Sequence, residues 1–188
     1  TNAMAAVGSC GAMCSFVVSL GTGMSLGANV TIATNIGSGR MDAVRRAVHT
    51  AMLAAVGGGI ILGLAGELVI EPIMAAMGIK DPEVEAMALL YMRIYLAGLP
   101  ILFLYDFEAA IMRSQGDTRT PLIALAISGT VNVGLNLLFV LVLGMDVDGV
   151  ASATVISSAV SSIILLWCLT HSDSVIRVNL RELAIDWP

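Results

Sequence analysis

A short charged turn at residues 113–121 (RSQGDTRTP) separates two long apolar segments, which cover residues 84–112 and 122–143. Each segment is longer than the roughly 20 residues that an α-helix needs to cross the hydrocarbon core of a bilayer. Two such segments joined by a polar turn predict a hairpin of membrane-spanning helices. Three further apolar segments, at 5–37, 43–69 and 150–169, extend this plan to five spans.

Composition supports a membrane protein, because 57% of the residues are hydrophobic and only 12% are charged. Soluble domains carry roughly 25% charged residues. We therefore expect an all-α, polytopic integral membrane bundle in contact with membrane lipid. No basic patch with interleaved aromatic residues occurs, so the sequence does not indicate nucleic-acid binding.

Proline and acidic residues predict where the spans begin, end and bend. Asp81 before Pro82 is typical of a capped helix start, and Thr120 before Pro121 predicts a second start of the same kind. Pro100 should kink the third span. Pro72 should end the second span and leave residues 73–79 as a short interfacial turn.

The placement of charge predicts how the chain is oriented. Seven of the nine basic residues lie in the 40–46 and 113–119 turns and in the 171–188 tail, whereas Lys80 lies with six acidic residues in the alternate turns: Glu71, Asp81, Glu83, Glu85, Asp146 and Asp148. The positive-inside rule puts the Arg-rich turns and the tail in the cytoplasm. The N-terminus then lies outside, which favours a further helix before Thr1. Alternatively, residues 1–3 are a tag remnant and Met4 is the natural start.

Four polar side chains are expected near one depth in the membrane. Tyr91, Asn136 and Thr154 fall within roughly 12 Å of the outer boundary at a rise of ~1.5 Å per residue, and Asn132 lies one turn deeper than Asn136. Their oxygens could coordinate Na⁺, with Asn132, Asn136 and Thr154 as ligands, or form a protonatable network. Ordinary interhelical hydrogen bonding is the alternative, and Tyr91 could be an interfacial anchor.

Three charged residues lie within the third span. Arg93, near the outer boundary, is expected to extend its side chain outward. Asp106 and Glu108 lie deeper, and because they are two residues apart they point in different directions on a helix. They could attract cations or carry protons in an inner cavity, or lie hydrated at the inner interface.

Other patterns indicate packing rather than chemistry. Gly23/Gly27 and Gly59/Gly63 are GxxxG pairs that favour close helix contacts. The three cysteines and two histidines have no metal-ligand spacing. No nucleophile, base and orienting group occur together, so we expect neither an enzyme nor a cofactor apart from a coupling ion, Na⁺ or H⁺.

Several motifs resemble one family in the correct order along nearly the whole chain. Residues 35–45 (NIGSGRMDAVR), 91–100 (YMRIYLAGLP), 113–121 (RSQGDTRTP), 132–136 (NVGLN) and 149–154 (GVASAT) resemble motifs of multidrug and toxic compound extrusion (MATE) transporters. The resemblance implies a twelve-helix, two-lobe transporter. Residues 1–170 would be helices two to six of the first lobe, and residues 171–188 a cytoplasmic tail or the start of the inter-lobe linker. The first helix and the second lobe would be partners outside this chain.

The resemblance also implies a role for the polar residues. The family's first-lobe cation site matches Asn132 and Thr154 by motif, while Asn136 stands where many members have Asp and cannot titrate. Tyr91 is the expected tyrosine of the site and Tyr95 the alternative; Asp106 and Glu108 lie outside the usual pattern, and the acid of helix one is not in this chain. The implied activity is export of cationic or amphipathic organic compounds by antiport with Na⁺ or H⁺ and alternating access. The alternatives are a flippase for lipid-linked or polysaccharide precursors and a non-transporting membrane scaffold.

Overall fold

The structure is a computed structural model that describes residues 2–79, 81–172 and 174–178. This part of the chain is helical and has no strand. Its elements are α1 (Asn2–Gly37), α2 (Met41–Ala76), α3 (Pro82–Ala97), α4 (Leu99–Ser114), α5 (Arg119–Asn136), the π-helical segment η1 (Leu137–Val142) and α6 (Val147–His171). Three residues named or counted in the predictions of orientation and of a preceding helix lie outside the described residues: Thr1, Lys80 and Arg181.

Five spans account for these elements. α1, α2, α5 with η1, and α6 are each long and apolar enough to cross a membrane. α3 and α4 together form a fifth span that is bent by 49°. The described chain is therefore the helical membrane bundle that the hydropathy pattern predicts.

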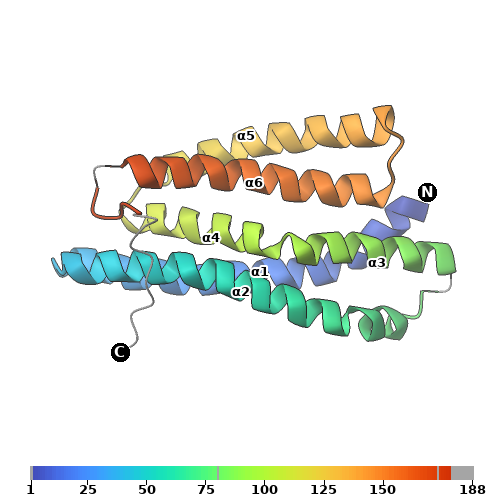
Figure 1. The fold of residues 1–188 in the computed structure, drawn as a ribbon, viewed down its shortest axis with the longest axis horizontal. Helices are drawn as coiled ribbons and strands as arrows, with labels where there is room; N and C mark the ends of the chain where they lie inside the picture. The colour runs from blue at the N-terminus through green and yellow to red at the C-terminus, as the bar shows by residue number, and fades with distance from the viewer. Residues whose placement is uncertain (1, 80, 173, 179–188) are drawn as a thin grey trace.

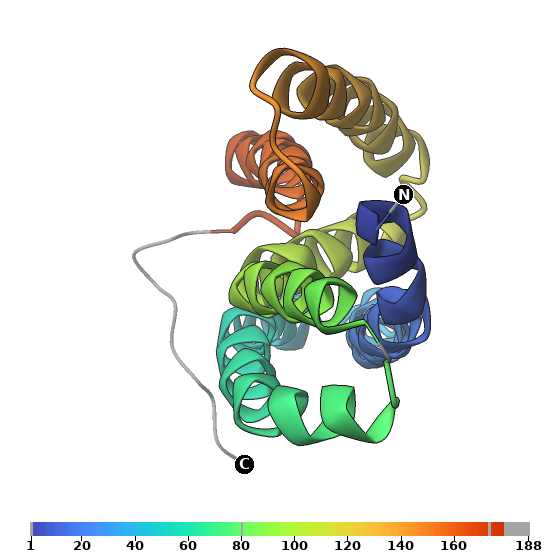
Figure 2. The same cartoon turned by 90° about the vertical axis from the view of Figure 1, so that its right-hand side faces the viewer.

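The spans form three layers around α3 and α4. Figure 1 shows the α3–α4 span in the middle, with α5 and α6 on one side and α1 and α2 on the other, and the end view in Figure 2 shows the same order. α4 contacts both α2 and α6, and α5 packs mainly on α6. Most of the buried polar side chains belong to α4, α5 and α6, namely Glu108, Ser128, Ser157, Ser161 and Ser162.

The bend between α3 and α4 lies at Gly98, two residues before Pro100. Pro100 has no N–H to donate to the carbonyl of Leu96, so the helix cannot continue regularly there. α2 packs against this bend through Gly59 and Gly63; a Cβ on Gly59 would lie 2.5 Å from the Pro100 Cα atom. The expected kink and this close contact are confirmed.

Two local predictions about packing and helix ends are wrong. Gly23 and Gly27 do not mediate close packing, because a Cβ on either would meet no atom of the described chain within 4 Å. Pro72 does not end the second span: α2 runs through it to Ala76. The proline removes one hydrogen bond near the end of a long helix, a loss that membrane helices tolerate.

The turn between α4 and α5 is closed by Asp117 rather than by Thr120. The Asp117 carboxylate accepts hydrogen bonds from the backbone N–H groups of Arg119 (3.1 Å) and Thr120 (3.0 Å). These donors, Thr120 first, lower the pKa of the Asp117 carboxyl group. Gly116, at φ +91°, supplies the left-handed residue that ends α4. At the start of α3, by contrast, Asp81 accepts from the Glu83 N–H (3.0 Å), which confirms the predicted cap.

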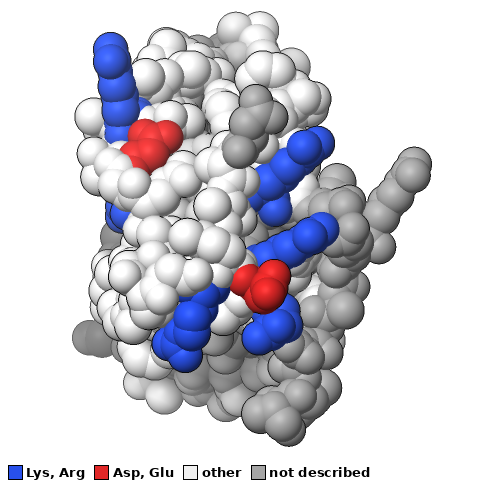
Figure 3. All heavy atoms as spheres, turned by 90° about the vertical axis from the view of Figure 1, so that its left-hand side faces the viewer, with Lys and Arg blue, Asp and Glu red and all other residues white. Residues whose placement is uncertain are grey.

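The cationic turns lie at one end of the bundle. The turns at 38–40 and 115–118 and the end of α6 lie together in Figure 1, opposite the end of α2 and the turn at 143–146. Figure 3 shows that Lys and Arg outnumber Asp and Glu on this end of the molecule. The alternation expected from the positive-inside rule is therefore present in the fold.

Candidate ion-binding site

Two asparagines on α5 form the centre of a polar contact between α5 and α6. The Asn132 side-chain amide donates to the Ser157 hydroxyl on α6 (3.2 Å). The Asn136 amide, one turn along α5, donates to the Asn132 side-chain oxygen (3.0 Å) and to the Asn132 carbonyl (2.9 Å). The structure thus brings together two of the three Na⁺ ligands expected from the sequence, and adds Ser157.

The side-chain oxygen of Asn136 has no hydrogen-bond partner within the described chain, although it is buried. A buried polar atom without a partner is costly, and more so in a membrane, where no water replaces the missing bond. An amide oxygen is a suitable ligand for a hard cation and a suitable acceptor for a protonated acid. The Asn132–Asn136 pair therefore fits an ion site completed by further oxygen ligands.

Thr154 contributes to this region through its backbone. Its carbonyl accepts from the hydroxyls of Ser157 (3.0 Å) and Ser158 (2.9 Å), while its own hydroxyl donates to the Val150 carbonyl (3.1 Å). The Thr154 hydroxyl, which the sequence predicts as an ion ligand, is thus hydrogen-bonded within α6 instead. It can turn toward an ion only by giving up that bond.

Asp106 lies in a second polar region, a cavity of about 180 Å³ between α1, α3, α4 and α6. Tyr95 and Ser158 line the same cavity. Gly21 of α1 allows the close approach, since a Cβ there would lie 3.0 Å from an Asp106 carboxylate oxygen. Tyr95 and Tyr105 therefore share a cavity with this acid, whereas Tyr91 is not among the residues that line it.

Tyr91 and Glu108 lie apart from both regions. Tyr91 belongs to the outer core between α1 and α3, and its ring stacks on that of Tyr95 with centroids 6.3 Å apart. Glu108 is fully buried in the inner half of α4, so it is not hydrated at the interface. As the spacing predicts, Asp106 and Glu108 face different surroundings.

Sequence reasoning missed the partners of Arg93. Its guanidinium lies 2.8 Å from the Glu67 carboxylate and also pairs with Glu71, both on α2. Glu67 and Glu71 are four residues apart and so share a helix face, a signal present in the sequence. All three side chains are more than two-fifths exposed, so the pairs add little stability.

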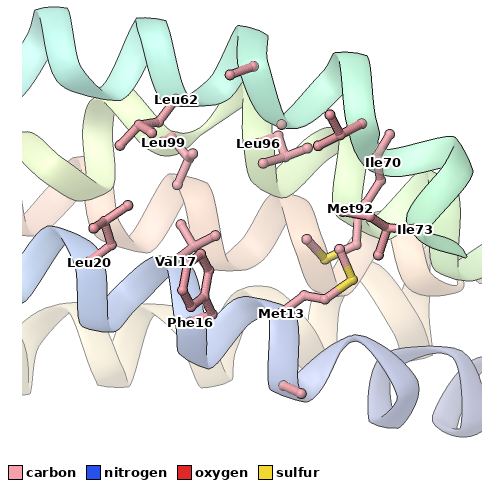
Figure 4. A pocket seen from close by; sticks show the side chains of 14 residues that line it. Met13, Phe16, Val17, Leu20, Leu62, Ile70, Ile73, Met92, Leu96 and Leu99 are labelled. Atoms are coloured by element: carbon pink, nitrogen blue, oxygen red, sulfur yellow. The ribbon is translucent and has the colours of Figure 1, made fainter. Parts of the chain in front are cut away.

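One large groove is entirely apolar. It measures about 480 Å³ and opens between α1 and α2, with residues of α3 and α4 as its floor, among them Phe16, Leu62, Met92 and Leu99. Figure 4 shows only carbon and sulfur in the side chains that line it. Without a polar group to orient a ligand, this groove is not the ion site.

Taken together, the five apolar spans and the polar residues buried between them define the class of this protein, a polytopic integral membrane protein. Comparison with protein families agrees, because the profile of the MatE family matches residues 1–138. The chain belongs to the MatE family. The match covers four of the five spans.

Individual relatives are transport and resistance proteins. The chain is 29% identical over 171 residues to the probable multidrug resistance protein YoeA of Bacillus subtilis, covering 88% of this chain and 36% of YoeA. It is 30% identical over 151 residues to the probable multidrug resistance protein NorM of Thermotoga maritima, covering 77% of this chain and 32% of that protein. The chain thus spans about a third of the length of these relatives.

Solved structures show the same fold. A MATE family multidrug resistance transporter in an inward-facing conformation matches with a TM-score of 0.90 and 26% identity, covering 97% of this chain and 42% of the other. An outward-facing conformation of a MATE transporter matches with a TM-score of 0.90 and 25% identity, covering 99% and 41%. The arrangement of the five spans is therefore that of one part of a MATE transporter.

Proposed function

We propose that this chain is part of the first lobe of a cation-coupled exporter of cationic or amphipathic organic compounds in the inner (plasma) membrane. The whole protein would include a helix before Thr1 and a second lobe. Antiport with Na⁺ or H⁺ would drive export by alternating access. The proposal rests chiefly on the buried Asn136 oxygen, which has no partner in the described chain and lies next to Asn132 within a MatE bundle.

The two conformations among the structural matches support a lobe that moves as one body. The same five spans match an inward-facing and an outward-facing MATE structure equally well, with TM-scores of 0.90 in both cases. A lobe with an unchanged interior can present one ion site to the two sides of the membrane in turn.

The two alternatives are less well supported. A flippase for anionic lipid-linked precursors would require a groove lined by several unpaired cations. Arg93 lies in the outer half of its span, and two glutamates, Glu67 and Glu71, pair with it. A scaffold without transport gives no reason for a buried amide oxygen that lacks a partner.

Transport by the full-length protein tests the proposal. Everted vesicles containing it should accumulate a cationic dye when a Na⁺ or H⁺ gradient is imposed, and replacing one ion by the other identifies the coupling ion. Asn136→Ala should weaken the dependence on that ion. The matched control is Thr130→Ala, because Thr130 is exposed on the same helix and its hydroxyl bonds within α5.

Two results would contradict the proposal. Dye accumulation that is indifferent to both gradients in vesicles that hold folded protein would favour the scaffold. Gradient-driven translocation of a lipid-linked precursor without dye transport would favour the flippase.

A further inference from the structure

Glu108 is a carboxylic acid enclosed in the inner half of the bundle. Its side chain is 0% exposed, and neither carboxylate oxygen has a hydrogen-bond partner in the described chain. It lies six residues before the end of α4, roughly 9 Å from that end at ~1.5 Å per residue. An ionised carboxylate left unpaired in such surroundings costs several kcal/mol. We therefore expect the enclosed Glu108 carboxylate to bind a cation, which is either a proton or a metal ion.

The surroundings of Glu108 suit a proton rather than a metal ion. The Ser162 hydroxyl of α6 is close enough to interact with the carboxyl group, although no hydrogen bond joins them. Hard metal ions such as Ca²⁺ and Mg²⁺ require about six oxygen ligands. One carboxyl group and one hydroxyl do not form such a shell, whereas a proton needs only one oxygen.

No described charge compensates Glu108 directly. α1 carries no charged residue. The inner parts of the other neighbouring elements carry these charged and titratable side chains: Asp42, Arg45, Arg46 and His49 of α2, Tyr105, Asp106 and Arg113 of α4, Asp117 and Arg119 at the start of α5, Cys168 and His171 of α6, and Arg177 after α6. None of these is a hydrogen-bond partner of the Glu108 oxygens.

A row of hydroxyls on α6 connects Glu108 with the Asp106 cavity. Thr154, Ser158 and Ser162 follow one another at four-residue spacing and therefore share one helix face. Ser158 lines the Asp106 cavity, and Ser162, about 6 Å further along α6, faces Glu108. Ser157 and Ser161 form a second row that turns to α5, where Ser161 donates to the Ala124 carbonyl (3.3 Å).

The Asp106 cavity can supply water to this row. Its volume of about 180 Å³ exceeds the roughly 30 Å³ that one water occupies in the liquid, and Tyr95, Asp106 and Ser158 provide polar partners. A serine hydroxyl both donates and accepts hydrogen bonds. Ser158 and Ser162 can therefore pass a proton between cavity water and the carboxyl group.

We propose that Glu108 is a proton-binding site of the lobe, distinct from the Asn132–Asn136 site, and that it exchanges its proton with the Asp106 cavity through Ser158 and Ser162. The step forms one O–H bond on a Glu108 oxygen and breaks one in a hydronium ion of the cavity, with the reverse on release. This proposal rests on the proposed function only where it concerns the use of the Glu108 site in transport. Proton binding itself does not depend on that use.

Infrared difference spectroscopy of the full-length protein in lipid tests this site without a transport assay. A change of pH should produce the C=O band of a protonated carboxyl group that Glu108→Gln removes. Glu67→Gln is the matched control, because the Glu67 carboxylate is exposed and paired with Arg93, and the band should persist. Persistence of the band in Glu108→Gln would overturn the proposal.

The route of exchange is tested by a second pair of variants that retain the carboxyl group. Ser162→Ala should slow deuterium exchange of the Glu108 band and shift its frequency. Ser161→Ala should change neither, because its hydroxyl bonds to α5. Equal exchange rates in Ser162→Ala and the unchanged protein would exclude the serine route and so overturn the proposal in this form.

Transport separates this inference from the proposed function. H⁺-driven dye export with an unaltered proton stoichiometry in Glu108→Gln would leave the function standing and contradict a coupling role for Glu108. A Glu108 band in a protein that transports no dye would support the proton site and contradict the exporter.

Discussion

Asp117 is the residue whose local role is best defined by its contacts. Its carboxylate caps α5 by accepting two backbone N–H groups, and Asp117→Ala should cost about 1 kcal/mol of unfolding free energy, as loss of a helix cap does. Because the folded-state pKa is lowered from 3.8, the stabilisation is present above that value and is lost as the pH falls through the lower folded pKa.

Thermal unfolding in detergent checks this prediction. The melting temperature of Asp117→Ala should lie below that of the parent at pH 7, and the difference should shrink in acid. Asp42→Ala serves as the control, since Asp42 is an exposed aspartate in the first turn of α2. Equal losses in the two variants would show that charge, rather than the cap, is responsible.

Single-residue properties predicted some of the site but not its geometry. Asn132 and Asn136 stand out because an amide in an apolar span requires a partner, and their i, i+4 spacing already places them side by side. Thr120 was the wrong choice of cap because Asp117, Thr118 and Thr120 are all suitable residue types, and only the turn geometry selects among them. The serine rows of α6 are visible in the spacing 157, 158, 161 and 162, but their partners on α4 and α5 depend on helix rotation.

At the scale of elements, the contact between α2 and the α3–α4 bend has a sharp requirement for glycine. A Cβ at position 59 would lie 2.5 Å from Pro100 Cα and 2.8 Å from Pro100 N. Backbone atoms cannot yield as a flexible side chain does, so Gly59→Ala should destabilise the bundle by about 1–3 kcal/mol, the usual cost of overpacking. A lower thermal unfolding temperature of the purified protein would register this loss.

Gly57→Ala is the matched control for this contact. Gly57 lies on the same helix, and a Cβ there would meet nothing within 4 Å in the described chain. This variant should be neutral or stabilising by about 0.5–1 kcal/mol through helix propensity. If both alanines lowered stability alike, the α2 contact with the bend would not be the cause.

Helix ends were harder to predict than helices. Hydropathy predicted every span, since 20 apolar residues have few alternatives to a membrane helix. Proline, however, interrupts one span and not another. α3 ends at Ala97, and the bend at Gly98 lies two residues before Pro100, while α2 continues through Pro72. Gly98 adds a flexible residue two positions before Pro100, whereas Ile70 stands two positions before Pro72. Proline alone therefore does not decide where a membrane helix breaks.

At the scale of the whole molecule, the grouping of the Arg-rich turns at one end could be predicted from charge, because charge is carried on turns, which the sequence shows directly. The positive-inside pattern needed no knowledge of packing, and Figure 1 places the Arg-rich turns at one end of the bundle. The Arg93 pairs with Glu67 and Glu71 could not be predicted in the same way. They depend on how far α2 and α3 are displaced along each other, which the sequence does not show.

A lobe that moves as one body should keep its internal distances while the transporter changes state. Spin labels at Ser38 and Gln115 report on this, because both residues lie in turns at the same end of the bundle. In full-length protein whose Cys10, Cys14 and Cys168 are replaced by alanine, the distance between these labels should remain constant when the coupling ion is added. The distance from Gln115 to a label beyond residue 188 should change. A Ser38–Gln115 distance that changes as much as the second one would mean that the lobe deforms internally, and the equal match to inward- and outward-facing structures would then need another explanation.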